Sequence, residues 1–420
     1  MRRVGGALRA RGIGDGDRVV FALPNSADLL TAMVATLRSG SVLVPLSPTL
    51  TDHERAVLFE DAEPSLVVDS PEVLASLFDG PEVALSSVPR SRPMHYTSGT
   101  TGRPKGVFSG LLDESEAAAL FGEEVELWGF ERADRNIVIS PLYHSAPLRF
   151  ASHTLLQGGE VIIQSGFDAS ALARTIAETN PTTAFVVPTH LQRLFAVGEL
   201  PSLRNFRLVV HAGAPCPVPV KHAAIEAFGL DPLWEYYGAT EGPFAVCPSA
   251  EWLERPGTVG RARPHRTLSV DEQGVIWCTP PAYGRWEYWR APEKTEAAWR
   301  ESSFTVFDLG RMDDDGYLYL DGRRVDLIIT GGVNVYPLEV EQALEPMPGL
   351  VEVVVFGVPD DEWGQRVCAA VVGDVDAARV RAYAKERLAP FKVPKDVFVL
   401  EELPRTGTGK VQRHKLVDLV

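Results

Sequence analysis

Residues 96–107 read Tyr96-Thr97-Ser98-Gly99-Thr100-Thr101-Gly102-Arg103-Pro104-Lys105-Gly106-Val107, and the rest of the chain is organised around this stretch. Its three glycines let the backbone turn tightly and present successive N–H groups, while four serine or threonine hydroxyls and one lysine supply further donors. A structural turn needs none of these donors. The pattern therefore predicts a loop that holds a chain of phosphates.

The spacing of this loop differs from the commonest phosphate loop, in which the lysine directly follows the last glycine. Here Lys105 follows Pro104, and a hydroxyl-rich half precedes a basic half. This order resembles the phosphate-binding loop of the acyl-adenylate-forming (AMP-binding) superfamily, which includes acyl-CoA synthetases, peptide-synthetase adenylation domains and beetle luciferases. A flexible linker is the alternative, and so long a match disfavours it. The resemblance implies that the ATP phosphates are bound by Thr97, Ser98, Gly99, Thr100, Thr101, Gly102 and Lys105.

Length and composition limit the possible classes of protein. A chain of 420 residues is long for a single core, so we expect two domains. With 45% hydrophobic and 23% charged residues, the chain is typical of a soluble globular protein. A net charge of -15 argues against a nucleic-acid or anionic-membrane partner, although a local basic pocket around an anionic ligand remains compatible with it.

The cysteines and the apolar runs indicate a cytoplasmic protein. No C-x-x-C pair occurs among Cys216, Cys247, Cys278 and Cys368, so we expect neither a zinc site nor a disulfide framework. The start, Met1-Arg2-Arg3, leads into glycines rather than an apolar stretch, which excludes a secretory signal. No apolar run approaches the roughly 20 residues of a membrane span, so no integral membrane segment is expected.

Strand and helix patterns alternate through most of the chain. Apolar residues recur at helical spacing from Leu29 to Leu37, and the segment from Val42 to Leu46 is typical of a buried strand. The same alternation returns between Ala169 and Tyr236, which favours an α/β fold with mostly parallel sheets and helices on their faces. Functional residues of such folds lie just past strand ends. Three places meet this rule: His144, Gly213-Ala214-Pro215 and Tyr237 to Glu241.

Shorter periods follow from Thr267 and predict two hairpins, one turning at Asp271–Gly274 and one at Asp321–Gly322. We place the domain boundary at the turn of the second hairpin, near Arg323. The expected parts are a large layered domain with a β-hairpin-rich portion, residues 1–322, and a small mobile α+β domain, residues 323–420. Because the first pattern, Val4 to Arg11, begins as the end of a helix, the chain resembles an N-terminally short member of the family.

The segment Tyr236-Tyr237-Gly238-Ala239-Thr240-Glu241 contains an aromatic face, a glycine, a hydroxyl and a carboxylate. A nucleotide with Mg²⁺ needs these groups for the base, for close backbone approach, for the α-phosphate and for the metal. The segment resembles the Y-G-x-T-E motif of the superfamily. The resemblance implies Tyr237 and Gly238 at adenine, Thr240 on phosphate and Glu241 on Mg²⁺. Taken by themselves, these six residues also fit an ordinary strand-to-loop turn, which is the alternative.

Two further segments resemble the nucleotide-binding parts of the family. Gly213, Ala214 and Pro215 resemble the second wall of the adenine site, and a β-turn is how such a wall would be made. Asp308 resembles the carboxylate that accepts both ribose hydroxyls, a role that suits an ionised side chain. The family usually has glycine before this aspartate, whereas this chain has Phe307. A ring there would narrow the space beside the sugar.

The C-terminal part carries three more matches. Arg323 resembles the ribose-binding arginine, although the usual hinge position holds Val325, and solvated arginines on a hairpin arm are the alternative. Gly331 and Gly332 resemble the loop that lines the pantetheine tunnel for CoA, or else form only a turn before a helix. Lys410, in Pro404-Arg405-Thr406-Gly407-Thr408-Gly409-Lys410, resembles the catalytic lysine that spans the substrate carboxylate and the α-phosphate.

In relatives an aromatic residue or histidine gates the acyl pocket, and the resemblance gives His144 this role. A lone histidine is more often a packing residue. Arg149 nearby pairs either with an acidic group of the substrate or with a structural carboxylate, and both readings stay open.

The resemblance covers essentially the whole chain and implies an AMP-forming acid–thiol ligase. A carboxylic acid would react with ATP and Mg²⁺ to give acyl-AMP and pyrophosphate, and the acyl group would pass to CoA. The alternative is a non-CoA acceptor: a carrier protein, an amine, or nitrite in arylamine diazotisation. Phe307, Val325 and the short N-terminal part motivate it. A non-catalytic nucleotide-binding module is remote, because Lys105 and Lys410 are both retained. The acid and the oligomeric state stay open.

Overall fold

The computed structural model describes residues 1–97, 104–213, 216, 218–322, 327–404 and 413–419. Two compact units divide the chain: the first unit comprises residues 1–48, 62–96 and 106–322, and the second unit comprises residues 49–61, 97–105 and 323–420. Both are mixed α/β structures, so the predicted fold class is confirmed.

A three-stranded parallel sheet lies near the N-terminus of the first unit, in the order β2-β1-β3. Its strands are β1 (Arg18–Phe21), β2 (Val42–Pro45) and β3 (Leu66–Val68), flanked by α1 (Arg2–Ala10), α2 (Ala27–Arg38) and α4 (Pro71–Ser76). Helix α2 begins where the Ser26 hydroxyl accepts the Leu29 N–H at 3.0 Å. The apolar residues predicted at helical spacing, including Leu29 and Leu37, are buried.

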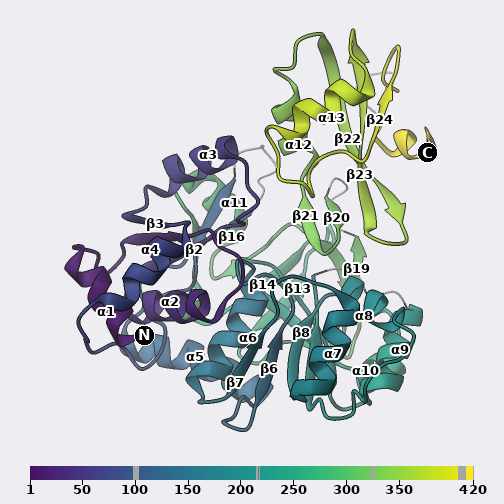
Figure 1. Cartoon of the computed structure of the whole chain (residues 1–420). Coiled ribbons are helices and arrows are strands. Elements are labelled where there is room, and N and C mark those ends of the chain that lie inside the picture. Colours follow the sequence, from purple (N-terminus) through teal and green to yellow (C-terminus); the bar gives the residue numbers. More distant parts are fainter. Residues whose placement is uncertain (98–103, 214–215, 217, 323–326, 405–412, 420) are drawn as a thin grey trace. The chain divides into compact units, whose positions relative to one another are not determined.

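A seven-stranded sheet forms the centre of the first unit, in the order β12-β11-β10-β9-β8-β6-β7. The parallel strands are β6 (Arg135–Val138), β7 (Glu160–Ile163), β8 (Thr183–Val186), β9 (Leu208–His211) and β10 (Leu233–Gly238); β11 (Pro243–Pro248) and β12 (Arg261–Ala262) are antiparallel. Helices cover both faces (Figure 1). Side chains alternate: Ala184 and Val186 face α7 (Ala169–Thr179), α8 (Pro188–Phe195) and α9 (Val218–Phe228), whereas Phe185 faces α5 (Glu114–Trp128) and α6 (Ser145–Leu156).

Small antiparallel sheets complete the first unit. The predicted hairpin of β13 (Thr267–Val270) and β14 (Ile276–Thr279) is confirmed, and the Asp271 carboxylate accepts the N–H groups of Gln273 and Val275 in its turn. The other elements are β4 (His95–Thr97), β5 (Lys105–Phe108), β15 (Glu287–Tyr288), β16 (Trp299–Arg300), β17 (Ser303–Phe304), α10 (Ser249–Glu254) and α11 (Pro292–Ala298).

The predicted hairpin at Asp321–Gly322 is wrong. Strand β19 (Leu318–Gly322) pairs with the preceding strand β18 (Leu309–Met312), and β20 (Ile328–Thr330) pairs with β21 (Val333–Val335). The turn before β19 is strongly determined, because the Asp313 carboxylate accepts the N–H groups of Asp315 and Tyr317, and Gly316 adopts φ +81°. The Asp-Gly pair at 321–322 therefore closes a strand instead of turning a hairpin.

The second unit contains a mixed sheet in the order β21-β20-β23-β22, with β24 beside β23. Its elements include α3 (Asp52–Ala62), α12 (Pro337–Leu344), β22 (Leu350–Asp360), β23 (Gly364–Gly373), α13 (Ala377–Lys385), β24 (Asp396–Val399) and a 3₁₀ helix, Arg413–Leu419. Val355 and Val371 face a core that includes Val340 and Val380 of α12 and α13, whereas Phe356 faces the terminal 3₁₀ helix around Leu416. Both faces of the sheet are therefore covered.

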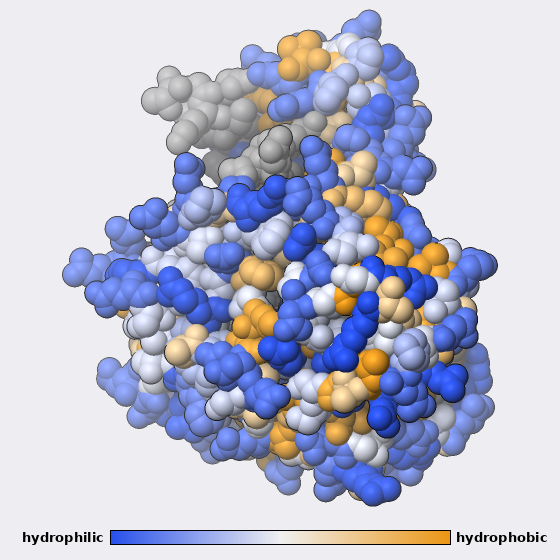
Figure 2. Space-filling view, turned by 90° about the vertical axis from the view of Figure 1, so that its left-hand side faces the viewer, coloured by the Kyte–Doolittle hydropathy of each residue, from blue (hydrophilic) through white to orange (hydrophobic). Residues whose placement is uncertain are grey.

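Hydrophilic side chains cover most of the face drawn in Figure 2, and the hydrophobic ones form separate groups. Within the described part of the chain, no helix combines the length and the apolar character needed to cross a membrane. None of the four cysteines forms a disulfide bond; Cys247, Cys278 and Cys368 are buried, and Cys216 is half-buried.

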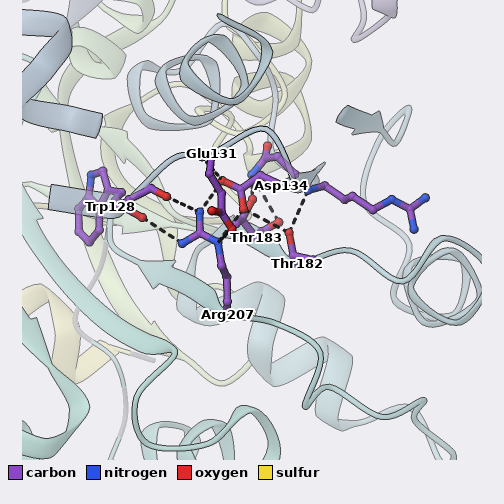
Figure 3. A network of polar contacts seen from close by, with 9 residues as sticks. Trp128, Glu131, Asp134, Thr182, Thr183 and Arg207 are labelled. Carbon is purple, nitrogen blue, oxygen red and sulfur yellow. Dashed lines mark hydrogen bonds and ion pairs between the residues drawn. The ribbon is translucent and has the colours of Figure 1, made fainter. Parts of the chain in front are cut away.

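A polar network links helix α5 to two strands of the central sheet (Figure 3). Asp134, just before β6, is buried, and Arg207, just before β9, donates two hydrogen bonds to its carboxylate, one of them at 2.6 Å. The Asp134 carboxylate also accepts the N–H of Glu131 at 2.9 Å. Arg207 further donates to the carbonyls of Trp128 and Gly129 at the end of α5, at 3.2 and 2.9 Å. One buried carboxylate thus holds three segments together.

We expect Asp134→Ala to lower the free energy of unfolding by about 2–3 kcal/mol, because it leaves the Arg207 guanidinium and the Glu131 N–H without their acceptor. Glu131→Ala is the matched control, since that carboxylate is 60% exposed and 3.9 Å from Arg207. The control should lower the free energy of unfolding, measured in urea, by less than about 1 kcal/mol. Equal costs for the two variants would contradict the assigned role of Asp134.

Candidate active site

A cavity in the first unit is lined by residues of α5, α6 and the turn between β10 and β11. Its apolar wall includes Leu120, Phe121, Leu148 and Phe304. Its polar wall contains arginines, glutamates and histidines together with hydroxyl side chains: Ser91, Arg92, His95, Glu124, Ser145, Arg149, Ser152, His153, Thr240, Glu241 and Arg266. The cavity thus combines an apolar body with several charged groups.

The turn after β10 brings Thr240 and Glu241 to this cavity. Ala239 and Gly242 exchange backbone hydrogen bonds of 2.9 and 3.2 Å, which closes the turn. A Cβ atom on Gly238 would lie 2.6 Å from the Tyr236 hydroxyl and 2.9 Å from the Gly242 carbonyl. Only glycine fits at this position of the turn. The close approach of this backbone to a nucleotide stays a prediction.

The carboxylate of Glu241 is buried and fixed. The Tyr288 hydroxyl donates to its Oε1 atom at 2.7 Å, and Arg92 donates from Nη2 to the backbone carbonyls of Thr240 and Glu241, both at 3.0 Å. The described residues contain no group of three or more His, Cys, Asp or Glu side chains placed to hold a metal. Mg²⁺ needs only one or two carboxylates when nucleotide phosphates supply the other ligands, and Glu241 fits that requirement.

Tyr237 and Asp308, both predicted at the nucleotide, meet in the structure. The Tyr237 hydroxyl donates to Asp308 Oδ2 at 2.8 Å, and both side chains are buried. Phe307 adopts φ +62°, and its N–H donates to the Thr305 hydroxyl at 2.9 Å. This left-handed backbone favours glycine over a residue with a side chain.

The other predicted nucleotide-binding residues are described only in part. Thr97 ends β4 and Lys105 begins β5, and the Thr97 hydroxyl lies 3.5 Å from the Lys105 carbonyl. Gly213 follows β9 with φ +89°. Gly331 and Gly332, with φ +57° and +80°, form the two-residue turn between β20 and β21. Outside the described residues lie Ser98, Gly99, Thr100, Thr101, Gly102, Ala214, Pro215, Arg323 and Lys410.

His144 is the N-cap residue directly before α6, and its ring packs against Tyr143 with centroids 4.5 Å apart. Burial lowers the pKa of His144 to about 4, so the imidazole is neutral at pH 7. His144 is not among the residues that line the cavity, whereas the next residue, Ser145, is. Its role as a gate stays a prediction.

A buried charged cluster beside the cavity was not predicted. Arg263 lies 2.9 Å from Glu124 and 3.6 Å from Glu123, and Arg266 lies 2.8 Å from Glu123. Arg149 faces Glu124 at 3.5 Å, so the structural-carboxylate reading of Arg149 is realised. Burial alone would raise the pKa of Glu124, but Arg149 and Arg263 lower it to about 2. The only sequence signals were adjacent glutamates inside α5 and the Arg-x-x-Arg spacing at 263–266.

Two histidines of the cavity wall are neutral. Burial, followed by the charges of His144 and Arg92, lowers the pKa of His95 to about 3. Burial likewise lowers the pKa of His153 to about 4, and its Nδ1–H donates to the Arg149 carbonyl at 2.7 Å. Neither imidazole supplies a positive charge at pH 7.

Comparison with known proteins shows the family of this chain. A family model described as AMP-binding enzyme matches residues 1–91 and 92–277, and one described as AMP-binding enzyme C-terminal domain matches residues 339–410. Indoleacetate–CoA ligase from Aromatoleum aromaticum is 30% identical, over 100% of this chain and 91% of that protein.

Two solved structures are similar over nearly the whole chain. A double mutant of o-succinylbenzoate CoA synthetase from Bacillus subtilis gives a TM-score of 0.88 at 27% identity, covering 99% of this chain and 92% of that one. The amide bond synthetase of Marinactinospora thermotolerans gives a TM-score of 0.85 at 28% identity, covering 100% and 93%. Since the family models match well over half of its residues, this chain belongs to the AMP-binding enzyme family.

Proposed function

We propose that the protein activates a carboxylic acid with ATP, releases pyrophosphate, and transfers the acyl group from acyl-AMP to CoA. The observation that carries this proposal is the closed turn at 238–242. This turn follows Tyr237, whose hydroxyl donates to Asp308, and it directs Thr240 and Glu241 to a cavity with an apolar wall. A nucleotide site and an acid site thereby adjoin within the first unit. Similarity to indoleacetate–CoA ligase supports the same reaction class.

The nucleoside would be bound by Tyr237 and Asp308. The Tyr237 ring offers a face for adenine, with Gly213, Ala214 and Pro215 as the second wall. Its hydroxyl fixes the Asp308 carboxylate before ATP arrives, so Asp308 is oriented to accept the ribose O–H groups. Arg323 would be a further ribose ligand.

Phosphate binding and acid activation would use separate groups. The loop from Thr97 to Lys105 would hold the β- and γ-phosphates, and Thr240 would donate to the α-phosphate. Glu241 would bind Mg²⁺, which neutralises phosphate charge when present. Lys410 would hold the substrate carboxylate against the α-phosphorus. A carboxylate oxygen then bonds to the α-phosphorus while the bond between that phosphorus and the pyrophosphate oxygen breaks.

The second half-reaction would place CoA along Gly331 and Gly332, whose turn has no side chains to obstruct the pantetheine arm. We propose that residues 323–420 act as a mobile domain against residues 1–322 between the two half-reactions. The CoA thiol attacks the acyl carbonyl, loses its proton, and releases AMP.

A non-CoA acceptor is the second candidate. The similarity to an amide bond synthetase favours an amine as the acceptor. A carrier protein, or nitrite in arylamine diazotisation, is the other form of this candidate. Phe307 also favours it, because a bulky residue stands beside Asp308 where relatives usually have glycine.

Lys410→Ala should slow pyrophosphate–ATP exchange by about 100-fold or more, because one donor to the developing charge is lost. Lys415→Ala, an exposed lysine near the same terminus, is the matched control and should leave exchange unchanged. Thermal unfolding of both variants verifies the fold. An unaltered exchange rate in Lys410→Ala would remove this lysine from the mechanism.

Glu241→Gln should raise the Mg²⁺ concentration for half-maximal exchange by about tenfold or more, since a charged contact is worth about 1.5–3 kcal/mol. The amide keeps an oxygen for the Tyr288 hydroxyl, so the turn should persist. Glu254→Gln, on the exposed end of α10, serves as control. The same Mg²⁺ dependence in Glu241→Gln and wild type would argue against Glu241 as the ligand.

Incubation with ATP, CoA and a panel of acids discriminates the two acceptors. A CoA ligase forms one thioester for each pyrophosphate released, which chromatography and a pyrophosphate assay measure together. Pyrophosphate release without thioester, and amide formation on adding an amine, would favour the second candidate.

A further inference from the structure

We infer that the acid activated by this protein carries a second anionic group, bound by Arg92 and Arg149 in the cavity of the first unit. This inference rests on the proposed function and names its substrate class. The acid would have an apolar body, a carboxylate that reacts, and a carboxylate or sulfonate that does not react.

Guanidinium groups outnumber the carboxylates placed to neutralise them. Glu123 and Glu124 are shared among three arginines: Arg263 contacts both, Arg266 contacts Glu123, and Arg149 contacts Glu124. Two negative charges therefore face three positive charges before Arg92 is counted. This imbalance lies in a desolvated region, since Glu123, Glu124 and Arg263 are all buried.

Arg92 adds a further charge that no carboxylate balances. Within the described ranges, no Asp or Glu oxygen lies within 4 Å of its guanidinium, and its Nη2 atom donates only to the backbone carbonyls of Thr240 and Glu241. Carbonyls accept hydrogen bonds but carry no net charge. The side chain is half-buried and lines the cavity, so a ligand there can reach it.

Arg149 is held beside the cavity with spare hydrogen-bonding capacity. Its Nε atom lies 3.5 Å from Glu124 Oε1 but makes no hydrogen bond, and its guanidinium lies over the Tyr236 ring at 5.2 Å. Glu124 is already engaged by Arg263 at 2.9 Å and by the Trp128 indole N–H at 2.9 Å. Arg149 therefore shares the Glu124 carboxylate with Arg263 and Trp128.

The cavity wall carries more guanidinium charge than carboxylate charge. The Glu241 carboxylate does not balance this excess positive charge in the working enzyme, because the proposed mechanism uses that carboxylate to bind Mg²⁺. A neutral acyl chain would leave these guanidiniums desolvated without a counter-charge, which is costly.

The apolar part of the wall limits the rest of the ligand. Leu120, Phe121, Leu148 and Phe304 offer contacts to a hydrocarbon or aromatic body between the two anionic ends. The geometry thus favours a dicarboxylate or a sulfo-carboxylate over a plain fatty or aromatic acid.

Matched acids test the inference. Phenylacetate is compared with its 4-carboxy and 4-sulfo derivatives, and hexanoate with hexanedioate. Calorimetric titration without ATP measures binding, and pyrophosphate release measures kcat/KM. One additional charged hydrogen bond should favour the dianion of each pair at least about tenfold. Preference for both derivatives indicates charge recognition, and preference for one tells which anion the site takes.

Arg92→Met should reduce the dianion-to-monoanion ratio about tenfold or more in both measurements, and Arg92→Lys should restore part of it. A merely structural role at the turn would lower both members of a pair alike and leave the ratio unchanged. Arg300→Met, an exposed arginine lying over Trp277, is the control and should not alter the ratio.

Failure of this inference and failure of the proposed function give different results. A monoanion preference, or a ratio unaffected by Arg92→Met, overturns the inference even where pyrophosphate is released. Preferential dianion binding through Arg92 without pyrophosphate release, for any acid, upholds the ligand class and overturns the proposed function.

Discussion

The close backbone approach at Gly238 is the constraint on which the site depends. Residue 238 ends the last parallel strand of the central sheet, and only a missing Cβ lets the chain reverse there beneath the Tyr236 hydroxyl. Because the reversal is closed by paired backbone hydrogen bonds, Glu241 lies at the cavity wall without depending on a long loop. Arg92 secures the turn by donating hydrogen bonds to the backbone carbonyls of Thr240 and Glu241. The central sheet, Tyr237 and the cavity are thus coupled through one residue.

Local patterns in the sequence identified elements whose burial follows their own periodicity. Helix α2 and the parallel strands were predictable because apolar residues repeat at 3.6 or run continuously. The second hairpin was predicted wrongly, since Asp321-Gly322 has turn chemistry that the stronger Asp313 turn overrides. Tyr237 and Asp308 were each predicted at the nucleotide from a family motif, and these roles stay predictions. Their mutual hydrogen bond was not predictable, because contacts between residues 71 apart leave no local signal.

The charged cluster shows a different limit of sequence reading. Glu123 and Glu124 lie in a helix where charged residues normally face solvent, yet both are buried. Their burial is tolerated because Arg263 and Arg266 arrive from a segment about 140 residues further along the chain, which no periodicity of α5 encodes. Ionic pairs of this kind stabilise little relative to apolar packing. Their effect here is to place charged groups along one wall of the cavity.

Phe307 joins the stability of the fold to the chemistry of the site. A non-glycine residue in the left-handed region costs about 1–2 kcal/mol, and this one directly precedes the Asp308 carboxylate. The strain persists because the Phe307 N–H donates to the Thr305 hydroxyl and the Tyr237 hydroxyl holds the next residue, Asp308. Relaxing the backbone at residue 307 would turn the carboxylate away from Tyr237. The aspartate is therefore oriented by contacts on both sides that override the local preference of the chain.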